Sequence, residues 1–479
     1  MTLSEITLKS LHFVMDLFCN TGEFKSPTGV FQKFLSSLVL QAVQAIPFVF
    51  NYLPFFFGFI SFSLIRSCYL EFCYSELYRP LYLSILFICF SEILFFAYCL
   101  KSNKKVNREA PPKRPQLTKQ QRADKIGMLS RSMLNIEHNY RGWLLMDKER
   151  MTSSSLNRNH ILDWVGWALF GKSAVEMDME ETKEVEGYCA EAGLDRILKV
   201  APQKNQKPIR LFNQLRVPFQ YIPLFIYVIV HILKSIGSVI LMCLRFKHES
   251  VKGIKNISYW VRYKKESKED PIVFCHGIGL GPIQYILFIY KLAQLHPNRS
   301  IVVLQLDYLT MNLVEKPVSR ELHLKFFDSI FAKYNFTQAH WVSHSFGSFL
   351  MSSIANERSH LVQNLTFIDP VCFNLMDPFL VYRVYNGQLK SNSFQYILRY
   401  LIAYEFSVVR FFLRNLWWDE MIFFPDYLKN ISGKVNVYLS EDDILVDYKT
   451  TNHHTIKDAP HGGCIFNSNL MESLLGNLS

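Results

Sequence analysis

From about residue 251 onward, the sequence predicts an α/β fold with a mostly parallel sheet and helices on both of its faces. Apolar runs of strand length alternate here with helical segments, which is the pattern of such a sheet. A strand, a sharp turn and a helix are expected to meet at residues 343–347. The earlier half of the chain contains long charge-free runs instead, so we expect a membrane-associated unit there.

The expected elements of the C-terminal half follow one another closely. Strands are predicted at 257–263, 271–275, 301–306, 365–368 and 435–439, with one more strand directly before residue 343. Helices are predicted at 320–334 and near 469–475. The strand at 271–275 runs into a glycine-rich turn, and the strand at 365–368 stops at Asp369.

The composition points toward lipid. The chain has 479 residues, which is too long for one compact core, and 49% of them are hydrophobic and 15% aromatic, with forty phenylalanines. Its ten cysteines show no metal-ligand spacing, so we expect reduced structural thiols and neither a metal site nor a cofactor. We expect membrane lipids and a hydrophobic acyl substrate as partners.

A two-helix transmembrane region is predicted at 34–100, after an N-terminal segment at 1–33 that lacks the basic start of a signal peptide. Residues 34–65 carry no charge and predict one tilted or bent helix, or a re-entrant pair broken at its prolines. Residues 80–100 are interrupted only by Glu92, which we expect to face the helical partner.

The basic segment at 101–125 predicts a cytosolic linker beside acidic headgroups. It holds nine Lys or Arg against two acids, and it follows an apolar run. Its three prolines and the lack of a recognised fold or aromatic platform argue against nucleic-acid binding. The positive-inside rule places both ends of the hairpin in the cytosol. We therefore expect an integral membrane protein of the endoplasmic reticulum or lipid droplet, with its later domain in the cytosol.

A helical region is predicted at 126–250, with an exposed acidic helix at 178–186. It ends in an apolar segment at 217–244 that contains His231 and Lys234. We expect this segment to lie in the membrane interface or against the later domain. A spanning helix stays open as the alternative and would move the later domain across the membrane, a placement that N-x-S/T sequons also fit: Asn256, Asn298, Asn335, Asn364 and Asn430.

The turn Ser343-His344-Ser345-Phe346-Gly347 has the pattern small-x-Ser-x-Gly. Small residues are needed two positions either side of a serine held on a strained turn, because larger ones would collide with the crossing elements. This pattern resembles the nucleophile elbow of the α/β-hydrolases, although Ser343 stands where glycine is usual.

Two further motifs extend the resemblance. A glycine-rich turn begins at His276, and a His-Gly-Gly ending begins at His461. Together with the elbow they make residues 251–479 similar to the α/β-hydrolase superfamily, of the esterase or lipase type. With the apolar segments before it, the chain resembles the membrane-associated, lipase-like hydrolases of fungi and other microbial eukaryotes.

The resemblance implies a Ser-His-Asp triad. Ser345 would be the nucleophile, His461 the base and Asp443 the acid, with Asp369 as the alternative acid. The 18 residues from Asp443 to His461 are fewer than usual in the family. His453 with Asp458 also spells the HxxxxD pattern of some acyltransferases, which we interpret as coincidence.

The resemblance also implies an oxyanion hole and a lid. The backbone N–H groups of Ile278 and Phe346 would hold the oxyanion, while Gly277 and Gly279 let the backbone approach the substrate. Residues 370–434 are rich in aromatics and are expected to form a lid over the site.

These features predict a membrane-anchored serine hydrolase that cleaves lipid or other hydrophobic carboxylic esters through an acyl-enzyme. An acyltransferase using the same triad is the first alternative. A catalytically inactive hydrolase-fold protein that binds lipid or a protein partner is the second, because a fold does not establish a reaction.

Overall fold

A computed structural model describes most of the chain from residue 45 onward. The described residues are 45–69, 79–109, 114, 116–132, 157–194, 198–201, 216–373, 375, 399–443, 445–446, 454–457, 459–466 and 468–476. The predicted N-terminal segment at 1–33, His453 and Asp458 lie outside these residues.

The C-terminal half forms one eight-stranded sheet with the order β1-β2-β4-β3-β5-β6-β7-β8. The pairs β1–β2 and β2–β4 are antiparallel and the other five pairs are parallel, as predicted for a mostly parallel sheet. The strand order reverses at β3, so the turns after β3 and β5 meet at one edge of the sheet, where sites of α/β folds lie. The strands are β1 (Lys247–Glu249), β2 (Ile257–Arg262), β3 (Ile272–Cys275), β4 (Ile301–Leu306), β5 (Ala339–His344), β6 (Val362–Ile368), β7 (Val435–Ser440) and β8 (His454–Ile456).

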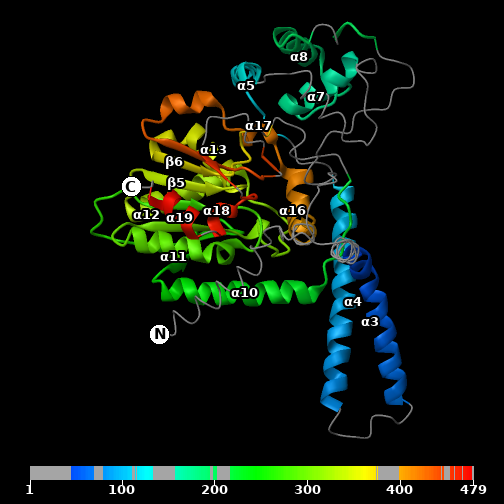
Figure 1. The fold of residues 1–479 in the computed structure, drawn as a ribbon. Coiled ribbons are helices and arrows are strands. Elements are labelled where there is room, and N and C mark those ends of the chain that lie inside the picture. The colour runs from blue at the N-terminus through cyan, green and yellow to red at the C-terminus, as the bar shows by residue number, and fades with distance from the viewer. Residues whose placement is uncertain are drawn as a thin grey trace, which may run out of the picture.

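Helices cover both faces of this sheet (Figure 1). Successive strand residues point to opposite faces, so Ile272 and Phe274 enter one hydrophobic cluster while Val273 and Cys275 enter another. The first cluster includes residues of α11 (Ile286–Leu295) and α19 (Ser468–Gly476); the second includes residues of α12 (Arg320–Tyr334) and α13 (Gly347–Glu357). The helix predicted at 320–334 is confirmed at both ends.

The sheet begins a few residues before the predicted start of this domain at 251. The strand β1 begins at Lys247 and pairs with β2, with Lys247 opposite Val261. Its sequence Lys-His-Glu is polar and contains no apolar run. Backbone pairing at the edge of the sheet, rather than side-chain burial, makes it a strand.

The apolar N-terminal segments form a hairpin of α3 (Ile46–Tyr69) and α4 (Arg79–Arg108), which projects from the rest of the molecule (Figure 1). Pro80–Arg108 is long and apolar enough to cross a membrane, and the apolar part of α3 is Val49–Ile65. Many side chains of this hairpin are large, apolar and exposed: Tyr52, Phe55, Phe56, Phe59, Phe62, Leu81, Leu83, Phe87 and Phe90.

The helix α4 extends beyond the predicted boundary between membrane helix and linker at 101. The helix α4 continues without a break to Arg108, because its last turns pack against the segment that leads into α10. Asn103 is buried there, and its side-chain amide donates to the carbonyl of Val217 at 3.2 Å.

The rest of the basic segment is not uniformly solvated either. Arg114 donates to Asp419 of α17 (Trp418–Met421) at 3.0 Å, and Lys125 donates to the same carboxylate at 2.5 Å. Both the Arg114 and Asp419 side chains are almost fully buried. These cations therefore tie the segment to the predicted lid region, whereas Lys101 and Lys104 remain exposed.

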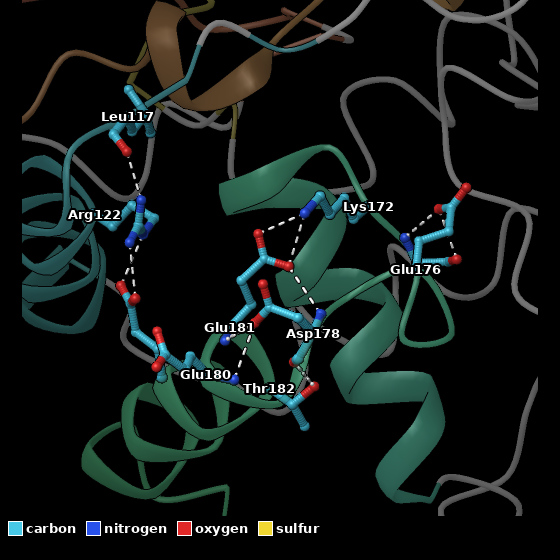
Figure 2. A network of polar contacts seen from close by, with 10 residues as sticks. Leu117, Arg122, Lys172, Glu176, Asp178, Glu180, Glu181 and Thr182 are labelled. Atoms are coloured by element: carbon cyan, nitrogen blue, oxygen red, sulfur yellow. Dashed lines mark hydrogen bonds and ion pairs between the residues drawn. The ribbon is translucent and has the colours of Figure 1, made fainter.

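The predicted acidic helix is α8 (Met179–Glu191), which packs beside α7 (Arg158–Phe170). The Asp178 carboxylate accepts from the amide of Glu181 at 2.9 Å, and Glu181 reaches back to the amide of Asp178 (Figure 2). This capping box fixes the start of α8. Arg122 of α5 (Lys119–Ser132) donates to both oxygens of Glu184, so a further cation of the basic segment is paired.

The apolar segment before the sheet forms α10 (Leu224–Cys243), which also has the length and composition of a membrane span. It runs across the hairpin rather than along it, and lies beside the α/β domain (Figure 1). Lys234 of α10 reaches the α/β domain. Its ammonium group donates to Asn312 at 2.7 Å and to the carbonyl of Thr310, so this face of α10 is joined to the domain.

Candidate active site

Ser345 occupies the sharp turn between β5 and α13. It has a φ of +50°, a left-handed conformation that is strained for a residue with a side chain. A Cβ at Gly347 would lie 2.0 Å from the carbonyl oxygen of Cys275, so only glycine allows α13 to approach β3 this closely. Ser343 is fully buried, and its hydroxyl has no hydrogen-bond partner within the described part of the chain.

The structure brings Ser345, His461 and Asp443 together. His461 Nε2 lies 2.8 Å from Ser345 Oγ, and His461 Nδ1 lies 2.7 Å from Asp443 Oδ2. An ionised carboxylate can only accept, so Nδ1 carries a hydrogen, and in the neutral imidazole Nε2 can accept from the serine. The short interval between Asp443 and His461 contains the strand β8 rather than a helix.

Asp443 is held by its own backbone surroundings. Its side chain is fully buried and accepts from the amides of Leu445 at 2.7 Å and Val446 at 3.1 Å. These two bonds hold one carboxylate oxygen in place and direct the other oxygen toward His461.

The alternative acid, Asp369, has another task. It is fully buried, accepts from the amide and hydroxyl of Ser440 at 2.7 and 2.8 Å, and accepts from the amide of Gly462 at 2.6 Å. Gly462 follows His461 directly, so Asp369 holds the loop that carries the imidazole while Asp443 contacts the imidazole itself. Burial raises the pKa of Asp369, and Asp443 nearby adds to that rise, although the charge of His461 opposes it.

The two carboxylates make the imidazole basic. Burial lowers the pKa of His461, but the charge and hydrogen bond of Asp443 and the charge of Asp369 outweigh burial and raise it to about 9. The polar atoms of these three residues also lie within 4.8 Å of one another. The hydrogen bonds described above already occupy these atoms.

The predicted oxyanion loop follows β3, beside Ser345. A Cβ at Gly277 would lie 3.0 Å from the Cβ of Ser345, so glycine allows the predicted close approach. The prediction also includes Gly277 and Gly279 in the oxyanion hole, but the amides of both residues already have acceptors. The amide of Gly277 donates to Tyr285 Oη at 2.9 Å, and the amide of Gly279 donates to the carbonyl of Leu309. For the amides of Ile278 and Phe346, the described residues supply no hydrogen-bond acceptor, so these two remain available.

Tyr285 connects the oxyanion loop to the elbow. Its hydroxyl accepts from Gly277 and lies 2.8 Å from His344 Nδ1. Burial, together with the nearby charges of His461 and His276, lowers the pKa of His344 far below its ordinary value. His344 is therefore neutral and accepts from the tyrosine. The sequence carried no signal for Tyr285, because its partners lie eight and 59 residues away.

Aromatic side chains of the predicted lid lie against the residue after the nucleophile. Phe411 and Phe412 follow α16 (Phe406–Arg410), and their ring centroids lie 5.2 and 6.1 Å from that of Phe346. The ring of Tyr308 also lies near Phe411, with 5.7 Å between the ring centroids. Residues 376–398 of the predicted lid lie outside the described residues.

No protein-family model matches the sequence, and no curated protein matches it. Among solved structures, a naproxen esterase from Bacillus subtilis is 13% identical over 52% of this chain and 98% of its own, with a TM-score of 0.36. A bacterial membrane phospholipase A is 13% identical over 53% and 93%, with a TM-score of 0.36. A meta-cleavage product hydrolase from Pseudomonas fluorescens IP01 is 14% identical over 46% and 93%, with a TM-score of 0.35.

The chain's own architecture settles its fold. The parallel strands in the order β4-β3-β5-β6-β7, the elbow after β5, and the acid and histidine after β7 and β8 all occur in residues 247–476. This part of the chain has the α/β-hydrolase fold.

Proposed function

We propose that this protein is a membrane-associated serine hydrolase of hydrophobic carboxylic esters. The observation that carries the proposal is the continuous hydrogen-bonded series from Asp443 through His461 to Ser345, on an elbow whose φ is strained. Ser345 is the nucleophile, His461 the base and Asp443 the orienting acid.

The reaction proceeds in two halves. As Ser345 Oγ attacks the ester carbonyl, its proton passes to His461 Nε2, and the carbonyl oxygen becomes an oxyanion that accepts from the amides of Ile278 and Phe346. His461 then protonates the departing alcohol, which leaves an acyl group on Ser345. Water attacks this acyl group with His461 again as the base, and the carboxylic acid leaves.

The surroundings of the site support an apolar substrate. The rings of Phe411, Phe412 and Phe346 pack together where the acyl group would approach the oxyanion donors. The exposed apolar surface of α3 and α4 supports a membrane location for such a substrate. The exposed cations at the end of α4 favour the cytosolic side.

Labelling with a fluorophosphonate, which reacts with activated serines, tests the proposal. The wild-type protein in detergent should be labelled, Ser345→Ala should not, and Ser329→Ala, which changes an exposed serine of α12, should be labelled as the wild type is. Equal labelling of Ser345→Ala, or no labelling of the wild type, would contradict the proposal. Product analysis with an acceptor alcohol present then separates hydrolysis from acyl transfer.

A further inference from the structure

One face of α10 is apolar and exposed along the whole helix. Residues 224–243 contain neither Asp nor Glu. An open groove of about 740 Å³ follows this face, lined in part by Val228, Ile232 and Leu313. The exposed apolar side chains of this face are Phe225, Val228, Ile229, Ile232, Leu233, Ile236, Val239 and Met242. A surface of this extent is typical of an interaction site rather than of free solvent-facing helix.

The opposite face of α10 is fixed, so the apolar face cannot turn inward. A Cβ at Gly237 would lie 2.7 Å from Ile283, which shows how closely the helix approaches the hydrolase domain. Lys234 donates to Asn312 at 2.7 Å, and the Tyr227 hydroxyl donates to Glu405, at the start of lid helix α16, at 3.2 Å. The exposed face therefore has a set direction relative to the active site.

Glu92 sets the direction of α10 relative to the membrane hairpin. Its buried carboxylate accepts from the amides of Leu224 and Phe225 at 3.0 Å each, and from the Tyr221 hydroxyl at 2.6 Å. A carboxylate at this position satisfies free N–H groups and complements the helix dipole. Glu92, the charge that interrupts the apolar run of α4, thus fixes the start of α10 against the hairpin.

The apolar surface is continuous from the hairpin to α10. The ring of Phe50 in α3 lies 6.5 Å from that of Phe225 at the start of α10. From this contact α10 extends along the hydrolase domain, and its free side faces the direction in which α3 and α4 project (Figure 1).

Exposed basic residues lie on both sides of α10 in the sequence and on α4. Arg216 precedes α10 and Arg245 follows it, and both are exposed. Lys101 and Lys104 are exposed on α4, nine and twelve residues beyond Glu92 on the domain side. Cations that border an apolar surface complement the anionic headgroups of a phospholipid leaflet.

We propose that α10 lies flat in one leaflet of a phospholipid bilayer, with its apolar face among the acyl chains, while α3 and α4 insert more deeply beside it. The 13 residues from Arg79 to Glu92 give the hairpin a reach of roughly 20 Å below α10, at about 1.5 Å per residue. This proposal rests on the membrane association proposed above. It places lid helix α16, through Glu405 and Tyr227, at the surface from which an ester lipid of that leaflet would approach.

Depth-dependent quenching tests the placement directly. An environment-sensitive fluorescent amino acid is placed at position 232, 59 or 175 of the full chain. Each labelled protein is reconstituted in vesicles of phosphatidylcholine and phosphatidylserine whose acyl chains carry bromine at shallow or deep positions. Phe59 and Ile232 are both well exposed, and Val175 in the loop after α7 is 93% exposed. Phe59 lies nine residues, or roughly 14 Å, beyond Phe50 on α3.

The expected pattern has three parts. Position 232 should be quenched best by shallow bromines, position 59 best by deep ones, and position 175 by neither. No quenching at position 232 would mean that protein, either a second copy or another partner, covers this face, and would overturn the proposal. Quenching at position 232 that matches position 59 would show a deeply inserted α10 and would overturn it as well.

A second experiment, which measures ester hydrolysis, distinguishes a failure of this proposal from a failure of the proposed activity. The double variant Ile232→Asp, Ile236→Asp should lower the ratio of vesicle-embedded to soluble ester hydrolysis at least tenfold, and Val175→Asp should leave that ratio unchanged. An unchanged ratio in the double variant would contradict the docking role. If the wild type hydrolysed neither ester, the proposed function would fail while the quenching pattern still decided the placement of α10.

Discussion

Two regions of this molecule hold buried carboxylates whose partners differ. At the candidate active site, Asp443 contacts His461 and Asp369 lies near it, so both carboxylates face a group that can gain and lose a proton. At the junction with the hairpin, Glu92 and Glu405 accept from backbone N–H groups at the starts of α10 and α16.

The carboxylates of both regions are buried, so burial by itself does not distinguish a catalytic carboxylate from a structural one. A backbone N–H keeps its hydrogen, and an acid beside it stabilises the end of a helix. An imidazole exchanges its hydrogen, and an acid beside it changes its basicity. A buried acid of this chain should therefore be assigned to catalysis only where its partner titrates.

Replacing Asp443 should have the largest effect. Asp443→Asn keeps the shape but removes the charge that orients His461, so kcat/KM on a soluble ester should fall about 10³- to 10⁴-fold. Far-UV and near-UV circular dichroism should stay as in the wild type. A loss below tenfold would mean that Asp369 serves as the triad acid. It would contradict the rule that the acid in contact with the titrating imidazole is the catalytic one.

Asp419 tests the structural use of a buried acid. Burial alone would raise its pKa, but the charges of Arg114 and Lys125 outweigh burial and hold the pKa well below the ordinary range. Asp419→Ala leaves Arg114 buried without its counter-charge and should lower the free energy of unfolding by about 3–5 kcal/mol. Glu315→Ala, which removes an exposed pair with Lys105, should cost about 0–1 kcal/mol. Equal losses of unfolding free energy for the two variants in denaturant titrations would contradict the structural role assigned to Asp419.

The pH profile should report the basic imidazole. His461 must be neutral to accept the serine proton, and its pKa is raised to about 9, so kcat/KM should rise about tenfold per pH unit up to that region. In Asp443→Asn the apparent pKa should move down, because burial then opposes the charge of Asp369 alone. Superimposable profiles for the two proteins would show that Asp443 does not set this basicity.

Tyr285 should affect the rate without affecting binding. Tyr285→Phe removes the hydroxyl that joins Gly277 to His344, which loosens the oxyanion loop relative to Ser345. The loss should be about 10- to 100-fold in kcat with KM unchanged, less than the loss of a direct oxyanion donor. Tyr290→Phe, on the same stretch of chain, should leave both constants unchanged. A rise in KM alone would assign Tyr285 to substrate binding.

Glu92 should show the smallest effect on chemistry. Glu92→Gln keeps one acceptor oxygen for the amides at the start of α10 and loses the other, so the protein in detergent should be about 1–2 kcal/mol less stable. The fluorophosphonate labelling rate should stay within about twofold of the wild type, as it should for the exposed control Glu321→Gln. A loss of labelling without a loss of stability would contradict a purely structural role for Glu92 and would assign it to catalysis.

The elements of the hydrolase domain could be predicted because their signals are local. Apolar runs of strand length and the small residues around Ser345 reflect backbone requirements within a few positions. The same reasoning named Ser345, Asp443 and His461, which lie together in the structure, and their catalytic roles stay a prediction. It missed β1, whose polar sequence forms a strand only through backbone pairing at the sheet edge.

Sequence alone thus determined the α/β architecture, the apolar hairpin and the identity of the three residues around the elbow. Tertiary structure alone decided which amides remain free for an oxyanion, since Gly277 and Gly279 donate to partners that no local pattern reveals. It also decided that Arg114 pairs with Asp419, 305 positions away, and that Glu92 holds α10. The physical reason is that backbone preferences act over a few residues, whereas hydrogen-bond and charge partners are set by which distant segments the packed core brings together.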